Sequence, residues 1–388
     1  MVSNRSKFIK IMVVSPSQKK CGVAEYTRDL VQELGKLVDV KIGPLPTFSK
    51  RKRTPELIEE INKTDITHIQ YHPDFCGIWR HPLMIHNFVV FLKQIKIPCV
   101  VTVHDLMIIR LHLRTSPRIS LKTAFHNIVA IPVINWTSYG KFLLGRFLNV
   151  ADHLIVHSNS TKYFLESLGI KSNKISVLYP GIPEIRPLDD DNILRKQLGL
   201  YSRKVITIFG FITPQKGYET VLNAMTVLPK DFVLLIAGGV RDESCNPYLE
   251  NLKATIATLG LQDRVVITGH LDDDRVKQVF SNSDAILLPY RRTIMSGVSY
   301  GLSYALSSGR PIIASNTPFF LEIERNYSAI KTFEDGNSEA LANAIIELFN
   351  SPDKTEDGAR EYCKIWNWKN VAEKTYQIYC RLLEERLA

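Results

Sequence analysis

A lysine and two glycines follow an apolar run near the middle of the chain. Residues 205–209 have the composition of a buried strand, Gly210 comes next, and Lys216 and Gly217 precede a helical pattern. A lysine beside the free N–H groups of a helix start offers a point charge and hydrogen-bond donors to a diphosphate. The alternative is a surface lysine at an ordinary turn, and we favour the phosphate site.

A turn of small residues follows a later apolar run. Ser296, Gly297 and Val298 lie between the run that ends at Pro289 and a further helical pattern. The free N–H groups at the start of such a helix could hold phosphate. Gly309 ends the same helical pattern, and we interpret it as a C-cap with no part in the chemistry.

Two strand ends in the first half carry polar or small residues. Gly22 opens a helical pattern after the first apolar run, where a missing side chain permits close approach of a sugar oxygen or an anion. Taken alone, Gly22 is better explained as an ordinary strand-to-helix turn. His104 and Asp105 follow the run 98–103, and His104 could offer its ring or its carbonyl to a sugar. A solvated loop histidine is the alternative, and we favour a functional role.

These positions require strands that alternate with helices. Strand-like runs occur at residues 9–14, 67–71, 98–103, 153–157, 205–209, 232–237, 264–268, 285–289 and 311–314, with helical patterns between them. Alternation of this kind predicts parallel sheets covered on both faces. A stretch rich in Pro and Asp at residues 180–200 separates the two series. The sequence therefore predicts an α/β fold of two doubly wound domains, with ligands in a cleft between their carboxyl edges.

The basic charge is concentrated in the first half of the chain. The 388 residues carry a net charge of +10, and residues 1–188 contain 26 Lys and Arg against 13 Asp and Glu. The remaining residues contain 23 and 26. A basic half indicates an anionic partner such as lipid headgroups, a pyrophosphate-linked acceptor or nucleic acid. Nucleic acid ranks below the others because no recognition motif accompanies the charge.

The composition limits the class of protein further. Six cysteines are scattered without a C-x-x-C pair, which argues against a disulfide framework or a zinc site. No apolar run is long enough to cross a bilayer. We expect a cytoplasmic chain. Basic and apolar residues alternate over residues 105–150, which predicts salt-sensitive peripheral binding to anionic lipid at the inner face of the membrane; a solvated helix pair is the alternative.

The order of these motifs resembles that of the retaining glycosyltransferases of family 4, which have the GT-B fold. The shared features are Gly22, the strand end from Thr102 to Asp105, Tyr179-Pro180-Gly181, Phe209-Gly210 with Lys216-Gly217, Ala237-Gly238-Gly239 and Gly309-Arg310-Pro311. They extend over nearly the whole chain. The resemblance implies an acceptor-binding Rossmann-like domain at residues 1–187, completed by a final helix at 366–388, and a donor-binding domain at 188–365.

Three positions depart from the family pattern. The family carries two glutamates around the donor helix where this chain has Ser296 and Tyr304, and an arginine where this chain has Phe211. The second glutamate normally contacts the nucleotide ribose. Tyr304 must replace that contact or leave it unmade, and Lys216 is the remaining cation of the pair.

The resemblance also implies the reaction and the residues that take part in it. A sugar passes from a nucleotide diphosphate to a glycan or lipid-linked acceptor with retention of configuration, in cell-envelope or polysaccharide synthesis, without metal or cofactor. The implied residues are His104 and Lys216 for catalysis, Gly22, Gly210, Lys216, Leu271, Ser296, Gly297, Val298 and Tyr304 for the donor, and Gly22, Val23, His104 and Asp105 for the acceptor. A nucleotide-sugar epimerase or hydrolase on the same fold, and a degenerate glycan-binding module, are the alternatives.

Overall fold

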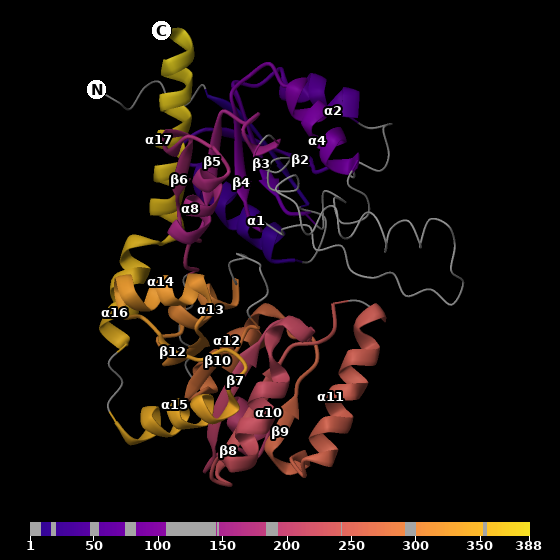
Figure 1. Cartoon of the computed structure of the whole chain (residues 1–388), viewed down its shortest axis with the longest axis vertical. Helices are drawn as coiled ribbons and strands as arrows, with labels where there is room; N and C mark the ends of the chain where they lie inside the picture. The colour runs from indigo at the N-terminus through magenta and orange to yellow at the C-terminus, as the bar shows by residue number, and fades with distance from the viewer. Residues whose placement is uncertain are drawn as a thin grey trace. The chain divides into compact units, whose positions relative to one another are not determined.

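The protein consists of two compact α/β units (Figure 1). The computed structural model describes residues 9–16, 21–46, 54–73, 83–105, 145, 147–183, 193–241, 243–291, 300–351 and 355–388. Among these residues, unit 1 comprises 9–181 and Trp368–Ala388, and unit 2 comprises 182–367. The cleft expected between the sheets stays a prediction.

Unit 1 is built on a parallel sheet in the order β2-β1-β3-β4-β5-β6. Its strands are β1 (Lys10–Ser15), β2 (Asp39–Pro44), β3 (Ile66–Tyr71), β4 (Cys99–Val103), β5 (His153–Val156) and β6 (Ile175–Val177). Every residue of β3, β4 and β5 is buried, as expected for a parallel sheet covered on both faces. The strand order reverses between β1 and β3, and ligands of such sheets bind at the carboxyl ends of the strands at this point.

Unit 2 contains a second parallel sheet, in the order β12-β11-β10-β7-β8-β9. Its strands are β7 (Lys204–Phe209), β8 (Phe232–Ala237), β9 (Val265–Ile267), β10 (Ala285–Leu288), β11 (Ile312–Ser315) and β12 (Lys331–Phe333). Here the order reverses between β7 and β10. This is the dinucleotide-fold arrangement, and it places the expected binding position beside the carboxyl ends of β7 and β10.

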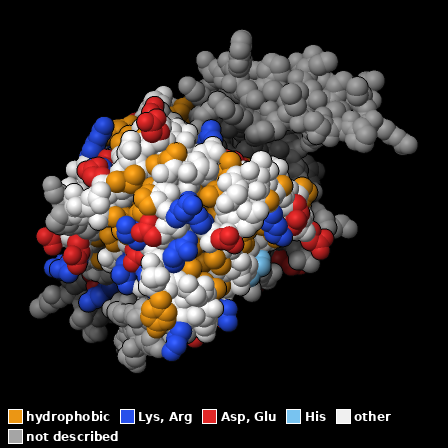
Figure 2. All heavy atoms as spheres, turned by 90° about the horizontal axis from the view of Figure 1, so that it is seen from below, with side chains coloured by type: hydrophobic (Ala, Val, Ile, Leu, Met, Phe, Trp, Pro, Cys, Tyr) orange, Lys and Arg blue, Asp and Glu red, His pale blue; other side chains and the backbone are white. Residues whose placement is uncertain are grey.

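Helices connect the strands and cover the sheets. Unit 1 contains α1 (Gly22–Leu34), α2 (Thr54–Ile61), α4 (Leu83–Lys93), α8 (Asn159–Ser167) and α17 (Trp368–Leu387). Unit 2 contains α9 (Ile193–Gln197), α10 (Tyr218–Val227), α11 (Asn246–Thr258), α12 (Asp273–Asn282), α13 (Tyr300–Ser307), α14 (Pro318–Tyr327), α15 (Ser338–Asn350) and α16 (Glu356–Ile365). On the face shown in Figure 2, basic, acidic and apolar side chains are interspersed.

The sequence prediction located the long apolar strands and missed three others. All nine predicted runs coincide with strands to within one or two residues. The missed strands are β2, β6 and β12, which are short or partly exposed and lack a continuous apolar run. Asp272 caps α12, since its carboxylate accepts a hydrogen bond from the backbone N–H of Arg275 at 2.8 Å.

The chain passes between the units beside Trp368. A side chain on Gly181 would lie 2.2 Å from the Trp368 indole, so the backbone and ring touch directly. The next residue, Ile182, donates its N–H to the Trp366 carbonyl at 2.8 Å. The two compact units divide at Gly181/Ile182 and at Asn367/Trp368, and the domain bounds 187/188 and 365/366 stay a prediction.

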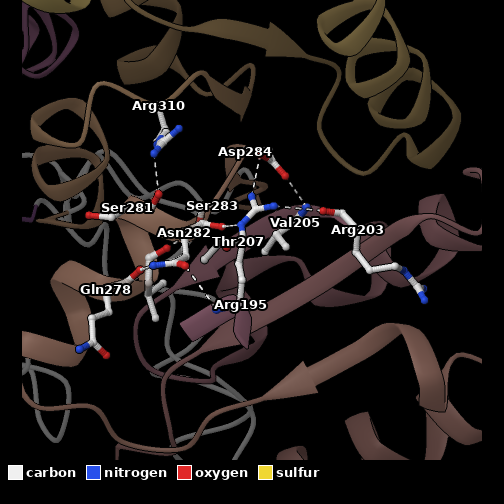
Figure 3. Close-up of polar contacts among 11 residues, drawn as sticks. Arg195, Arg203, Val205, Thr207, Gln278, Ser281, Asn282, Ser283, Asp284 and Arg310 are labelled. Carbon is white, nitrogen blue, oxygen red and sulfur yellow. Dashed lines mark hydrogen bonds and ion pairs between the residues drawn. The ribbon is translucent and has the colours of Figure 1, made fainter. Parts of the chain in front are cut away.

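Arg195, a largely buried arginine of α9, joins this helix to the sheet of unit 2 (Figure 3). The Arg195 guanidinium pairs with the Asp284 carboxylate at 2.7 Å and donates to the carbonyls of Asn282 and Arg203. The second Asp284 oxygen accepts from the Val205 N–H at 2.7 Å. These bonds fix α9 to the amino ends of β7 and β10.

Arg195→Ala should destabilise unit 2 by about 2–3 kcal/mol, because it leaves two carbonyls and a carboxylate without their donor. The Arg195 side chain is 15% exposed, so water replaces it poorly. Urea unfolding measures the effect. The control is Lys253→Ala, which removes an exposed ion pair with Glu250 and should cost at most about 0.5 kcal/mol. Equal losses would contradict a structural role for Arg195.

Candidate functional site

Lys216 lies at the point where the strand order of unit 2 reverses. It ends a short 3₁₀ turn, Pro214–Lys216, and Gly217 is the N-cap residue of α10. The turn is attached to the chain after β10, because the Arg291 N–H donates to the Gln215 carbonyl at 2.9 Å. The lysine predicted to bind phosphate is therefore held between the carboxyl ends of β7 and β10.

The Lys216 ammonium group is oriented by two acceptors. It donates to the Phe209 carbonyl at 3.2 Å and to the hydroxyl of Tyr290, and it lies 4.2 Å from the centre of the Tyr290 ring. The Tyr290 carbonyl in turn accepts from the Ser315 hydroxyl. An ammonium group has three N–H donors, so among the residues that the structure describes one N–H of Lys216 has no acceptor after these two bonds. Lys216 is half-buried here, rather than exposed at a helix start.

Glycines allow the backbone to pack tightly around this ammonium group. Gly210 has φ +115°, and a Cβ there would lie 3.1 Å from the Lys216 ammonium nitrogen. A Cβ on Gly238 would lie 2.1 Å from the Gly210 carbonyl oxygen, and one on Gly217 would lie 2.0 Å from the Pro289 carbonyl oxygen. The three glycines bring the loops after β7, β8 and β10 into direct contact.

The other predicted donor residues have different surroundings. Leu271 follows the turn after β9 and packs partly buried against the apolar cluster below the sheet. The Tyr304 ring on α13 is stacked at 5.9 Å on Phe280 and lies 5.5 Å from Phe209. Phe211, in place of the usual arginine, makes an edge contact with His270 at 6.1 Å. Ser296, Gly297 and Val298 lie outside the described residues.

In unit 1 the predicted acceptor residues lie at the carboxyl edge of the sheet. Gly22 and Val23 begin α1, with the Val23 side chain buried. His104 and Asp105 follow β4, and the His104 N–H donates to the Tyr71 carbonyl at 3.0 Å. Tyr26 of α1 contacts the His104 ring at 4.7 Å, so α1 and the end of β4 are adjacent.

A chain of buried polar side chains holds the His104 ring. Its Nε2 donates to the Gln70 Oε1 at 2.7 Å, and its Nδ1 lies 3.4 Å from the Nε2 of His157. The His157 Nδ1 donates to the Leu178 carbonyl at 2.7 Å. Both ring nitrogens of His104 therefore already contact other side chains.

The chain continues away from His104 to α17. The Gln70 amide lies 3.3 Å from the Nε2 of His68, which also contacts the Thr102 hydroxyl at 2.7 Å. The Nδ1 of His68 bonds the Tyr379 hydroxyl at 2.6 Å. The last helix thus contributes to the support of His104 indirectly, through His68 and Gln70.

Burial keeps these histidines neutral. Desolvation, together with the nearby His153 and His157, lowers the pKa of His68 to about 3, and desolvation lowers that of His157 to about 4. The pKa of His104 also lies well below 6.5 because of burial and the nearby His157. A neutral His104 has no spare proton at pH 7, so it is not a general acid in this arrangement.

Stability should fall as the pH is lowered from about 6.5 toward 4. Unfolded histidines take up protons near pH 6.5, whereas His68, His153 and His157 do so only near pH 3–4, so the unfolded state binds more protons in this window. Each such histidine should remove about 2 kcal/mol at pH 5 relative to pH 7. Urea unfolding at pH 7, 6 and 5 measures this, and His153→Asn should reduce the slope. A constant stability over this range would contradict the neutral state.

Tyr290, Gln70 and His157 were not predicted as site residues. Their signal in the sequence is weak: Gln70 and His68 are polar residues in an otherwise apolar strand, and Tyr290 simply follows a strand-ending proline. Among the described residues, no three His, Cys, Asp or Glu side chains gather as a metal site would require. No helix in the described part of the chain is both long and apolar enough to span a bilayer.

Comparison with protein families accounts for both units. Residues 21–186 match the family "Glycosyltransferase Family 4", and residues 190–365 match "Glycosyl transferases group 1". The chain belongs to family 4 of the glycosyltransferases. The family 4 match comes first in the chain and the group 1 match follows it. The fold is the α/β GT-B fold.

Individual relatives agree with this family. The chain is 25% identical over 334 residues to the alpha-monoglucosyldiacylglycerol synthase of Streptococcus pneumoniae, covering 81% of this chain and 66% of that protein. It is 26% identical over 194 residues to a GDP-mannose-dependent phosphatidylinositol monomannoside mannosyltransferase of Mycobacterium tuberculosis, covering 47% and 48%. The matches thus span about half to two thirds of these relatives.

Solved structures show the same fold. Anabaena HepE in complex with UDP superposes with a TM-score of 0.73 at 16% identity, covering 96% of this chain and 100% of that one. Sucrose-phosphate synthase of Thermosynechococcus elongatus superposes with a TM-score of 0.72 at 18% identity, covering 97% and 100%.

Proposed function

We propose that this glycosyltransferase moves a sugar from a nucleotide diphosphate to a glycan or lipid-linked acceptor with retention of anomeric configuration. The observation that supports this most is the Lys216 ammonium group, held at the strand-order reversal of unit 2 with one N–H that has no acceptor in the described part of the chain. A cation at this position suits a diphosphate, because ligands of doubly wound sheets bind there.

The proposed role of Lys216 is to stabilise the departing nucleotide diphosphate. When the bond from the sugar to the diphosphate breaks, negative charge grows on the phosphate oxygen. An ammonium group already fixed by Phe209 and Tyr290 stabilises that charge without first having to be oriented. No metal is needed for this contribution. HepE was solved with UDP and with UDP-glucose, which supports a nucleoside diphosphate sugar as the donor class.

The proposed acceptor side is the carboxyl edge of unit 1, with Gly22, Val23, His104 and Asp105. Since both ring nitrogens of His104 contact other side chains, its main-chain carbonyl is the group we assign to a sugar hydroxyl. Two relatives are named for glycosylation of diacylglycerol and phosphatidylinositol lipids. These names support a lipid-linked acceptor. With such an acceptor we also propose a role in the cell envelope and work at the inner face of the membrane.

A panel of nucleoside diphosphates tests the donor site. The matching nucleotide should raise the melting temperature, because a ligand at a hundred times its Kd stabilises the native state by about 2.7 kcal/mol. Other bases should act more weakly. Incubation with the corresponding nucleotide sugar alone should leave it unconverted, and conversion without acceptor would instead indicate an epimerase or hydrolase. No response to any nucleotide would favour the glycan-binding module.

A further inference from the structure

Unit 1 has a cavity of about 650 Å³ at the amino edge of its sheet. It lies where β4 and β5 begin, beside the last turns of α17, and its lining includes Pro98, His153, Lys174 and Leu382. His104 and Asp105, which we assign to the acceptor, follow the opposite end of β4. A five-residue strand is on the order of 15 Å long, so the cavity is separate from that edge.

Basic side chains dominate the lining. Lys96, Lys171, Lys174, Arg381 and Arg386 face two acidic residues, Asp152 and Glu385. One Asp152 oxygen accepts a hydrogen bond from the Cys99 N–H at 2.7 Å, so this oxygen is bonded to the backbone of β4 and not to a cation of the cavity. The cavity therefore has an excess of positive charge in one unit of the protein.

Arg381 is fixed by a buried histidine. Its guanidinium donates to the Nδ1 of His153 at 3.0 Å, and the Nε2 of His153 bonds the Ser176 hydroxyl at 2.9 Å. Because a guanidinium can only donate, the Nδ1 of His153 carries a lone pair and the ring is neutral. The partner carboxylate of Glu385 is 3.8 Å away and largely exposed, so it neutralises Arg381 weakly.

The remaining cations differ in how they are held. The Lys174 ammonium group donates to the Asn149 carbonyl, and the Arg386 guanidinium donates to the Lys96 carbonyl. Within the described part of the chain, no acceptor contacts the ammonium groups of Lys96 or Lys171. The cavity thus combines an oriented guanidinium with two ammonium groups available to a ligand.

We propose that this cavity binds a ligand with one or more phosphate groups, separately from the donor site. A fixed guanidinium presents paired N–H donors that match phosphate oxygens, and flexible lysines add charge around it. Its volume is large enough for a phosphorylated small molecule or a phospholipid headgroup. These two sources share the same chemistry, and the experiment below separates them.

The test uses the full chain carrying Lys216→Ala, so that pyrophosphate binding at the donor site is weakened and contributes less. Two measurements are made on this variant and on the same variant with Lys96→Ala and Lys171→Ala added. One is calorimetry with inorganic pyrophosphate. The other is co-sedimentation with phosphatidylcholine vesicles, with and without phosphatidylglycerol. Both lysines are exposed, so the protein should still fold. We expect pyrophosphate or vesicle binding to weaken about tenfold or more. Loss confined to vesicles indicates a headgroup, and loss for pyrophosphate indicates a soluble ligand.

The matched control replaces Lys230 and Lys253 of unit 2, which removes the same charge away from the cavity. It should leave both measurements within about twofold. An equal loss in the control would show a general effect of net charge and would overturn the proposal. Binding to neither probe, or binding that does not depend on Lys96 and Lys171, would also overturn it.

Discussion

Replacing Lys216 with alanine is expected to lower both nucleoside diphosphate affinity and the efficiency of sugar transfer by about ten- to a thousandfold. The ammonium group lies at the strand-order reversal, where it donates to the Phe209 carbonyl, and the usual arginine is replaced by Phe211. A charge-assisted bond to phosphate contributes about 1.5–3 kcal/mol, and each 1.36 kcal/mol corresponds to a factor of ten. Titration calorimetry and product formation measure the two effects.

Lys204 provides a matched control for this substitution. It also belongs to unit 2 and lies over an aromatic ring, with its ammonium nitrogen 4.8 Å from the centre of Phe232. However, it stands at the amino end of β7, at the opposite edge of the same sheet. Lys204→Ala should therefore leave nucleotide affinity unchanged. If Lys216→Ala behaves like Lys204→Ala, the donor site is misplaced.

Tyr290 tests how the ammonium group is oriented. Tyr290→Phe keeps the ring under Lys216 and removes the hydroxyl acceptor. A smaller effect than that of Lys216→Ala, seen mainly in the rate, would agree with an orienting role. A tyrosine hydroxyl does not change the apolar pattern that predicts a strand or a helix. The sequence analysis therefore did not identify Tyr290 as a site residue.

The sequence predicted the parts of the fold that depend on local apolar pattern. Buried parallel strands such as β8 consist of one continuous apolar run, so they are visible without the structure. The edge strand β2 is mostly exposed, with Gly43 its one buried residue, and β12 has three residues, so neither has an apolar run and tertiary pairing decides them. The crossing beside Trp368 depends on a contact between residues far apart in the chain.

The site was predictable only in part for the same reason. Lys216 and Gly217 are neighbours in the sequence, and the helix start beside them is a local feature. The support of His104 comes from β3, β5 and α17, through Gln70, His157 and His68 with Tyr379. Contacts between residues far apart in the chain have no fixed spacing in the sequence. The polar residues inside otherwise apolar strands were the one feature of the sequence that indicated this network.

Gly217→Ala is the second substitution with a large expected effect. Gly217 has φ +67°, and a Cβ there would lie 2.0 Å from the Pro289 carbonyl oxygen. Alanine would therefore cost about 1–2 kcal/mol for the left-handed conformation and a further cost for the clash with backbone that cannot move independently. We expect a total loss of at least about 3 kcal/mol in urea unfolding, together with weaker nucleotide binding, because the adjacent Lys216 must move.

Gly260→Ala separates the two causes. Gly260 has almost the same φ, +65°, but a Cβ added there would have no atom within 4 Å, so only the conformational cost of about 1–2 kcal/mol applies. It also stands after α11, away from the ends of β7 and β10, so nucleotide affinity should not change. If the two variants lose equal stability, the contact between Gly217 and Pro289 does not constrain the loops. If Gly217→Ala keeps full nucleotide affinity while folded, the contact between these loops does not position Lys216.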